Sequence, residues 1–131
     1  MTTSLVIAAA LLVMQGTHGI SWPTPVSELS EDCRIAEVVT TSGSRAAGDP
    51  GAVGLHLGRC YGYIQGFMNA FTAWAQSGPA QDMCIPKEVT LQQLAKVFLK
   101  YANDNPAKLH EKADSALVRA FSDAWPCPKK K

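Results

Sequence analysis

The side chains with the most reactive chemistry in this sequence are four cysteines, Cys33, Cys60, Cys84 and Cys127. A thiolate is a nucleophile and a metal ligand, whereas two thiols can also join as a disulfide. His56 stands four residues before Cys60, which places both on one helical face as a candidate Cys/His nucleophile or half of a metal site. No third ligand stands nearby, and an even number of cysteines in a short chain is typical of disulfides. We therefore predict structural cysteines, no metal and no cofactor, and keep the Cys60–His56 site as the alternative.

Patterns for other kinds of catalysis are missing from the sequence. The carboxylates that could serve as acids or bases are scattered and suit solvated helix faces; they are Asp82, Glu88, Asp104, Glu111, Asp114 and Asp123. The sequence contains no phosphate-binding loop, no HExxH metal motif and no GxSxG nucleophile motif. We predict that the protein is not an enzyme.

Length and composition narrow the class of protein further. The 131 residues are 47% hydrophobic and 18% charged, which indicates one folded domain rather than a disordered chain. Twelve lysines and arginines against 11 acidic residues give a formal charge of +1, and three of the lysines form the run 129–131. A protein that binds nucleic acid non-specifically needs a strong basic excess, so we predict no nucleic-acid partner.

The N-terminal segment predicts export. Leu5 to Met14 are ten apolar residues without charge, too few for a transmembrane helix of about 20 residues and typical of the hydrophobic region of a secretory signal peptide. Small residues follow, and we place cleavage after Gly19; the first four residues carry no lysine or arginine. We predict a signal peptide over residues 1–19, a single helical domain over 20–131, and no membrane contact after signal removal. Disulfides form in the oxidising compartments that exported proteins reach.

Apolar residues at three- and four-residue steps predict four helices and no sheet. We expect these helices at about 28–40, 55–76, 91–102 and 106–124, with a loop over 41–54. Ser27 would cap the first helix, while Thr90 with Gln93 forms a capping box for the third. Pro106 suits the first position of the fourth helix. The predicted fold class is all-α, a small disulfide-stapled bundle of about four helices.

The order of these helices predicts how the cysteines pair. A short turn joins the third and fourth helices, so they should run antiparallel and bring Cys84, before one, to the same end as Cys127, after the other. Cys33 and Cys60 lie on the inner faces of the first two helices. We therefore predict the disulfides Cys33–Cys60 and Cys84–Cys127. Loop-closure entropy gives them roughly 3.6 and 4.0 kcal/mol, a large share of a typical domain stability of about 5–15 kcal/mol.

A second stripe on the predicted second helix carries only small residues, every fourth one: Gly54, Gly58, Gly62, Gly66 and Ala70. Each interior glycine costs a helix roughly 1 kcal/mol relative to alanine. A stripe of them indicates that another backbone comes close there, either within the chain or from a second chain. In membranes this spacing marks helix dimers, but Arg59, Gln65 and Asn69 interrupt the segment, which favours a crossing between soluble helices.

Several short motifs carry a family resemblance. They are Cys60 to Phe67 (CYGYIQGF), Cys84-Ile85-Pro86, Val89 to Leu94 (VTLQQL), Lys100-Tyr101 with Asn105-Pro106, and Ala124-Trp125-Pro126-Cys127. With these motifs in this order, the chain resembles the Tai/Rap family of immunity proteins over about residues 33–127. The resemblance implies an exported, helical, disulfide-bonded protein that binds and inhibits a peptidoglycan amidase effector of the type VI secretion system. It also implies a periplasmic location and a homodimer.

The resemblance implies that exposed surface, covering the amidase cleft, carries the inhibition. We expect this surface in the polar loops 77–83 and 103–105; the candidate partner-binding residues are Ser77, Gln81, Asp82, Asn103, Asp104 and Asn105. The alternative function is a periplasmic stress chaperone-like helper protein without catalytic activity. Such a chaperone would expose apolar surface at low pH, and the sparse charge of this chain leaves few groups to titrate together.

Overall fold

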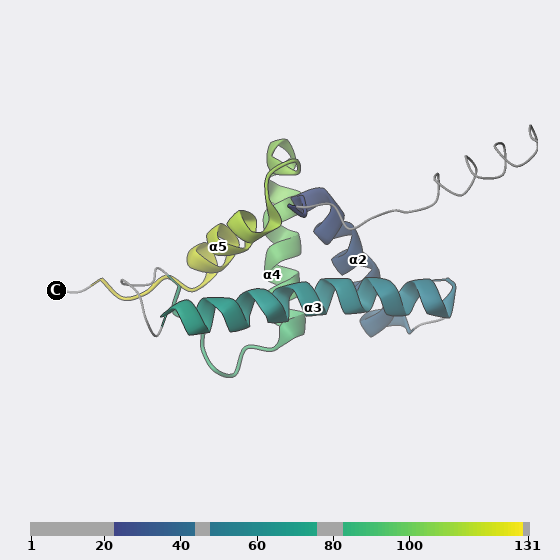
Figure 1. Cartoon of the computed structure of the whole chain (residues 1–131), viewed down its shortest axis with the longest axis horizontal. Helices are drawn as coiled ribbons and strands as arrows, with labels where there is room; N and C mark the ends of the chain where they lie inside the picture. The colour runs from purple at the N-terminus through teal and green to yellow at the C-terminus, as the bar shows by residue number, and fades with distance from the viewer. Residues whose placement is uncertain (1–22, 44–47, 76–82, 130–131) are drawn as a thin grey trace, which may run out of the picture.

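Figure 1 shows the fold, known from a computed structural model that describes residues 23–43, 48–75 and 83–129. Within these ranges it consists of four α-helices, which are α2 (Val26–Ser42), α3 (Pro50–Ala75), α4 (Leu91–Asp104) and α5 (Ala113–Ala124). A short 3-10 helix, η3 (Pro106–Lys108), lies between α4 and α5. Apart from two isolated β-bridges, the described residues form no strand, and the prediction of an all-α bundle is confirmed. The predicted signal peptide over residues 1–19 lies outside the described part.

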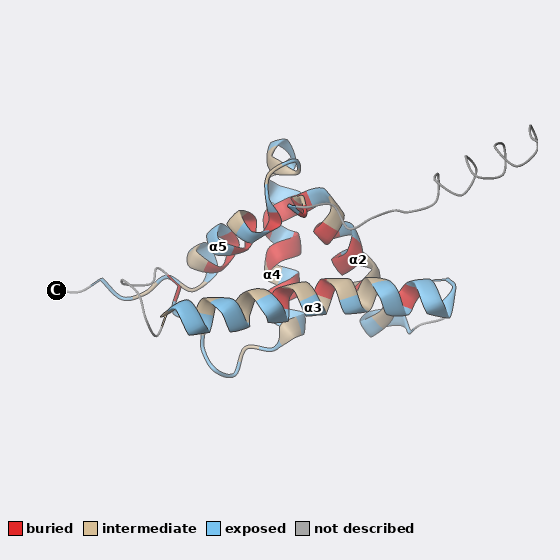
Figure 2. Cartoon of the chain, in the orientation of Figure 1, coloured by how far each residue is buried: buried red, intermediate tan, exposed pale blue. Residues whose placement is uncertain are grey.

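Helix α4 forms the centre of the bundle. It crosses the long α3, and α2 and α5 lie on either side of it (Figure 1). Its buried side chains recur at the steps of one helical face; they are Leu94, Ala95, Phe98, Leu99, Tyr101 and Ala102. Figure 2 shows buried residues on the sides of the helices that face one another and exposed residues on the outer sides. Phe98 is fully buried, as are Leu29 of α2, Ile64 of α3 and Phe121 of α5, so every helix contributes a large apolar residue to one core.

The start of α4 confirms the predicted capping box. The amide of Gln93 donates to the Thr90 hydroxyl at 3.2 Å, and the amide of Thr90 donates to the Gln93 side-chain oxygen at 2.8 Å. Helix geometry alone leaves such terminal amides without partners. At the other end the Asn105 side chain donates to the carbonyl of Tyr101 at 2.9 Å. Side chains therefore fix both ends of the central helix.

The structure corrects the start of α2. We predicted a helix from residue 28 with Ser27 as its cap, but the helix begins at Val26 and no side chain caps it. Instead the amides of Val26 and Ser27 donate to the carbonyls of Glu111 and Leu109, each at 2.9 Å. Because the connection between α4 and α5 supplies these acceptors, the helix needs no local cap.

Helix α3 begins earlier than predicted. We assigned 41–54 to a loop, yet α2 continues to Ser42 and α3 starts at Pro50. The Asp49 carboxylate accepts hydrogen bonds from the amides of Gly51 and Ala52, each at 3.0 Å. A proline in the first helical position after a capping aspartate is a regular helix start, which the glycines around it concealed.

Helix α5 is shorter than predicted. We expected a helix from Pro106, but Pro106 opens only η3, and α5 begins at Ala113. The amide of Ala113 donates to the carbonyl of Thr24 at 2.9 Å, and Pro25 forms an isolated β-bridge with Lys112. The segment before α2 therefore docks on this connection and interrupts the helix that the local sequence favours.

Both predicted disulfides are confirmed. Cys33–Cys60 joins α2 to α3, and Cys84–Cys127 joins the segment before α4 to the segment after α5; the two Cα atoms are 4.9 Å apart in each. The amide of Cys84 also donates to the carbonyl of Trp125 at 2.9 Å. The chain entering α4 and the chain leaving α5 thus meet, as the short connection between the helices predicted.

Within the described ranges, the small-residue stripe of α3 does not meet another backbone of this chain. A methyl group built on Gly54, Gly58, Gly62 or Gly66 would find no atom within 4 Å outside its own helix backbone. Of the two alternatives that the sequence left open, a close crossing within the described part of the chain does not form, and a crossing between two chains stays a prediction. Among the described helices, none is both long and apolar enough to cross a membrane.

Candidate partner-binding surfaces

The thiol site that the sequence left open does not form. Cys60 is joined to Cys33, and no cysteine in the described part of the chain is free. The His56 ring faces α2 instead, where its Nδ1 lies 2.6 Å from the Asp32 Oδ1 atom. A disulfide sulfur is not a thiolate nucleophile, so the alternative of a Cys60–His56 catalytic pair is wrong. Within the described ranges, no three histidine, cysteine or acidic side chains are placed to hold a metal ion.

Three charged or titratable side chains gather around Asp32 between α2 and α3, a grouping that the sequence analysis missed. The Asp32 side chain is only 4% exposed. Its two oxygens lie 2.6 Å from His56 Nδ1 and 3.2 Å from Arg59 Nε, and Arg59 also pairs with Glu28. A buried carboxylate needs such partners because burial removes its water. We call Glu28, Asp32, His56 and Arg59 the Asp32 cluster; it fixes α3 against α2.

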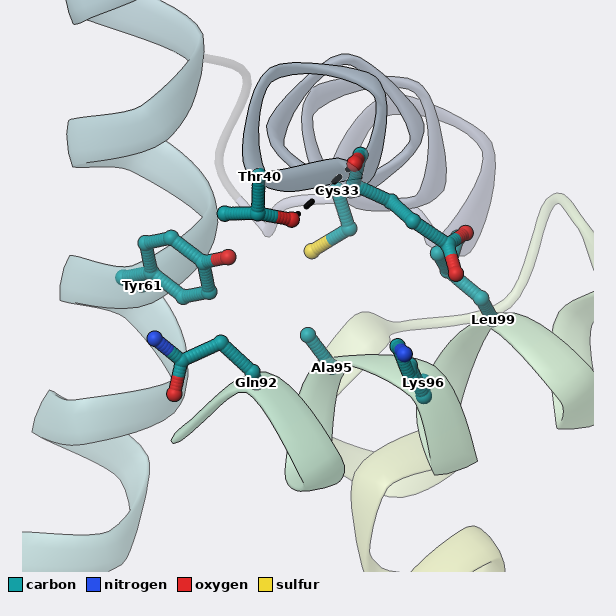
Figure 3. Close-up of a pocket in the computed structure, with 8 residues that line it drawn as sticks. Cys33, Thr40, Tyr61, Gln92, Ala95, Lys96 and Leu99 are labelled. Carbon is teal, nitrogen blue, oxygen red and sulfur yellow. Dashed lines mark hydrogen bonds between the residues drawn. The ribbon is translucent and has the colours of Figure 1, made fainter. Parts of the chain in front are cut away.

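A narrow hollow lies where α2, α3 and α4 meet (Figure 3). Its lining is Cys33, Glu37, Thr40, Tyr61, Gln92, Ala95, Lys96 and Leu99. The Thr40 hydroxyl is already engaged, because it donates to the Glu37 carbonyl at 2.9 Å. The volume is about 10 Å³, which is room for about one water molecule. The hollow is a gap in the packing and is too small to bind a substrate.

A wider groove runs between α4 and α5, and we call it the acidic groove. Its volume is about 290 Å³, and its lining is Val97, Lys100, Tyr101, Asp104, Asn105, Ala120, Asp123 and Ala124. Two of the predicted partner-binding residues, Asp104 and Asn105, therefore line a real depression in the surface. The predicted loop 103–105 is corrected, because Asn103 and Asp104 belong to the last turn of α4. Asn103 is exposed at the end of that helix.

A second groove lies between α3 and the segment before α4, and we call it the uncharged groove. Its volume is about 420 Å³, and its lining is Met68, Phe71, Thr72, Ala75, Met83, Cys84 and Ile85. The ring of Phe71 lies 6.4 Å from that of Trp74, which is 59% exposed. The predicted contact residues Ser77, Gln81 and Asp82 follow α3 in the sequence and lie outside the described residues.

Ion pairs and burial shift the pKa of three side chains on or near α5. The hydrogen bond from Arg119 lowers the pKa of Glu111, while Tyr101 and Glu111 raise the pKa of Arg119. The buried Tyr101 hydroxyl has no partner in hydrogen-bond geometry within the described ranges. Burial, with the Asp114 charge, raises the pKa of Tyr63. None of these three shifted groups lines either groove.

Comparison with known proteins gives one match. The model of one protein family, described as Rap1a immunity proteins, matches residues 26–127. No curated protein matches the chain, and no solved structure does. The matched range begins with the first residue of α2 and ends at Cys127, so it includes all four helices and both disulfides.

Proposed function

Because this chain belongs to the Rap1a immunity protein family, we propose that it binds and inhibits a peptidoglycan amidase effector of the type VI secretion system in the periplasm. The observation that carries the proposal is the family match over the complete helical bundle. An immunity protein acts by binding its effector, so the partner is a protein and no cofactor is required. The motifs from Cys60 to Cys127 that resemble the Tai/Rap family support an amidase as the effector.

The disulfides and the N-terminal sequence support the periplasmic location. Two disulfides form and persist outside the reducing cytosol. The uncharged apolar run 5–14 has the length of a signal-peptide core. We infer that residues 1–19 are removed on export and that residues 20–131 remain as one domain.

The inhibition that we propose is non-covalent. All cysteines of the described chain are in disulfides, so no thiol is available to attack an effector. A stable complex would bury about 800 Å² on each partner. Helices that two disulfides and a capping box hold in place lose little freedom on binding, which favours affinity.

A homodimer is part of the proposal, and the open face of α3 is the surface that we assign to it. No atom of residues 23–43, 48–75 or 83–129 would meet a methyl group built on Gly54, Gly58, Gly62 or Gly66 of this face, the atoms of the helix's own neighbouring residues aside. Leu55 and Trp74, each 59% exposed, lie near its two ends. We expect the exported protein to have twice the chain mass in light scattering, and Gly62→Arg to give the monomer mass; a wild-type monomer would contradict the dimer.

The test of the function uses the exported protein with both disulfides formed. It would be mixed with purified peptidoglycan amidases, the hydrolases encoded beside its own gene among them, and the release of fragments from peptidoglycan would be followed. We expect the activity of one amidase to be abolished at about one chain per enzyme. If no hydrolase is bound or inhibited, the proposal is wrong. Suppressed aggregation of unrelated proteins at low pH would then favour the chaperone-like alternative.

A further inference from the structure

We propose that the acidic groove between α4 and α5 receives an arginine side chain of the inhibited effector. The identity of the partner rests on the proposed function, whereas the chemistry of the occupant rests on the groove itself. The groove offers an apolar floor and carboxylates at its edge, and arginine is the side chain that combines an aliphatic stem with a charged planar end.

The floor of the groove suits the stem of such a side chain. The buried Tyr101 and Ala120 and the partly buried Val97 line it, and the exposed Ala124 extends the apolar lining outward. The short side chains of Val97, Ala120 and Ala124 leave the groove a volume of about 290 Å³. The methylene groups of an arginine gain stability by packing against an apolar surface of this kind while its guanidinium reaches the edge.

The edge of the groove carries an excess of negative charge. The lining contains two aspartates, Asp104 and Asp123, and one lysine, Lys100, so its formal charge is −1. Lys100 Nζ lies 2.6 Å from the Asp104 carboxylate, while no hydrogen bond or ion pair in the described part of the chain engages the Asp123 side chain. A guanidinium presents several N–H donors in one plane and pairs with carboxylates more specifically than an ammonium does.

The lysine already in the groove does not block the site. Its side chain is 78% exposed, and that of Asp104 is 55% exposed. A pair this exposed contributes little to stability, so Lys100 can move into water when a better-fitting cation arrives. Lys100 is therefore a competitor of the occupant, which gives a distinctive prediction: its removal should strengthen binding.

The walls of the groove are in place before binding. The Asn105 side-chain nitrogen donates a hydrogen bond to the Tyr101 carbonyl oxygen at 2.9 Å and so fixes the end of α4. On the other wall the Trp125 amide donates to the Phe121 carbonyl at 2.8 Å, and the Cys84–Cys127 disulfide follows directly. Walls that need no rearrangement reduce the entropy lost on binding.

The first test needs no effector. N-acetyl-arginine amide would be titrated into the isotope-labelled exported protein at low salt, with the citrulline amide as a neutral probe of the same shape. We expect saturating NMR shifts at the groove amides with a dissociation constant on the order of a millimolar, at least about tenfold weaker for citrulline and weakened in about 0.5 M salt. Equal shifts with both probes, or no saturation, would overturn the proposal.

Variants of the groove test whether its charged residues bind the arginine amide, and a matched control variant accounts for effects on folding. The double variant D104N/D123N should weaken arginine-amide binding by at least about tenfold. The matched control E31Q/E88Q removes the same charge from two exposed residues outside the groove and should leave binding unchanged. Lys100→Met should strengthen binding by about two- to fivefold, because it removes the competing cation. Weaker binding by Lys100→Met, or unchanged binding by D104N/D123N, would overturn the proposal.

The second test identifies the partner that supplies the arginine. In the amidase mixture described above, D104N/D123N should raise the dissociation constant of the complex by at least about tenfold, and the control E31Q/E88Q should not. An effector complex that D104N/D123N leaves unchanged would overturn the assignment of the arginine to the effector. If no hydrolase binds at all, the proposed function fails, while the arginine-amide titration still decides the chemistry of the groove.

Discussion

The two disulfides hold very different parts of the molecule. Cys33 and Cys60 are completely buried at the contact of α2 with α3, next to the Asp32 cluster in the sequence. Cys84 is exposed and Cys127 is half-buried, where the chain enters α4 and leaves α5. The sequence separations are 27 and 43 residues, so chain entropy alone would rank the peripheral disulfide slightly higher. We expect burial, rather than loop length, to decide which disulfide contributes more to stability.

Replacing each disulfide with two alanines tests this ranking and should give the largest effects. We expect C33A/C60A to lower the free energy of unfolding by about 5–6 kcal/mol and C84A/C127A by about 4 kcal/mol. Only the buried pair leaves unfilled space in the core in addition to a less restricted unfolded chain. Urea unfolding followed by circular dichroism measures both losses. An equal or larger loss for C84A/C127A would mean that loop closure outweighs burial.

A buried and an exposed charge pair should differ in the same direction as the buried and the exposed disulfide. Asp32→Ala should cost about 2–3 kcal/mol, because it leaves Arg59 without its buried carboxylate. The Arg59 and His56 side chains are 27% and 28% exposed, which keeps the loss below that of a fully buried pair. Asp104→Ala breaks only the exposed pair with Lys100 and should cost less than about 0.5 kcal/mol. The same urea titration compares them, and similar losses would mean that burial does not decide what a charge pair contributes to stability.

A smaller difference in stability should separate the start of α4, which a side chain caps, from the start of α2, whose amides donate to distant backbone carbonyls. Thr90→Ala should cost about 1 kcal/mol, since it removes the side-chain oxygen that accepts the Gln93 amide. Ser27→Ala should be close to neutral, because the Ser27 amide donates to the backbone carbonyl of Leu109, which the substitution keeps. Thermal unfolding of the two variants beside the wild type would show the difference. A loss for Ser27→Ala as large as that for Thr90→Ala would mean that Ser27 caps α2 after all.

Much of the fold was predictable because the decisive signals are local. The capping box of α4 needs only Thr90 and Gln93, and the disulfide pairing follows from helix order and a short connection. The starts of α2 and α5 were not predictable in this way. Their first amides bond to carbonyls of Glu111 and Thr24, which are distant in sequence and come close only in the assembled fold.

The candidate sites were only partly predictable, for a related reason. Asp104 and Asn105 were chosen as polar residues near a turn, and they line the acidic groove. The groove itself depends on how α4 crosses α5, which no sequence pattern states. The Asp32 cluster had a signal that went unused: Asp32 and Arg59 directly precede Cys33 and Cys60. A disulfide between these cysteines brings their charged neighbours together.

The smallest effect concerns Glu111, at the contact of α2 with the segment before α5. Its backbone carbonyl accepts the Val26 amide, and its side chain pairs with Arg119. The hydrogen bond from Arg119 lowers the pKa of Glu111 below its usual value of 4.5. The folded state therefore favours the ionised form, and this contribution to stability is present above pH 4.5 and is lost as the pH falls through the lowered pKa. Glu111→Gln should be slightly less stable than the wild type at pH 7, with the difference vanishing in strong acid. Urea midpoints from pH 7 to pH 2 measure it. A difference that stays constant with pH would mean that the side chain acts by packing rather than by charge.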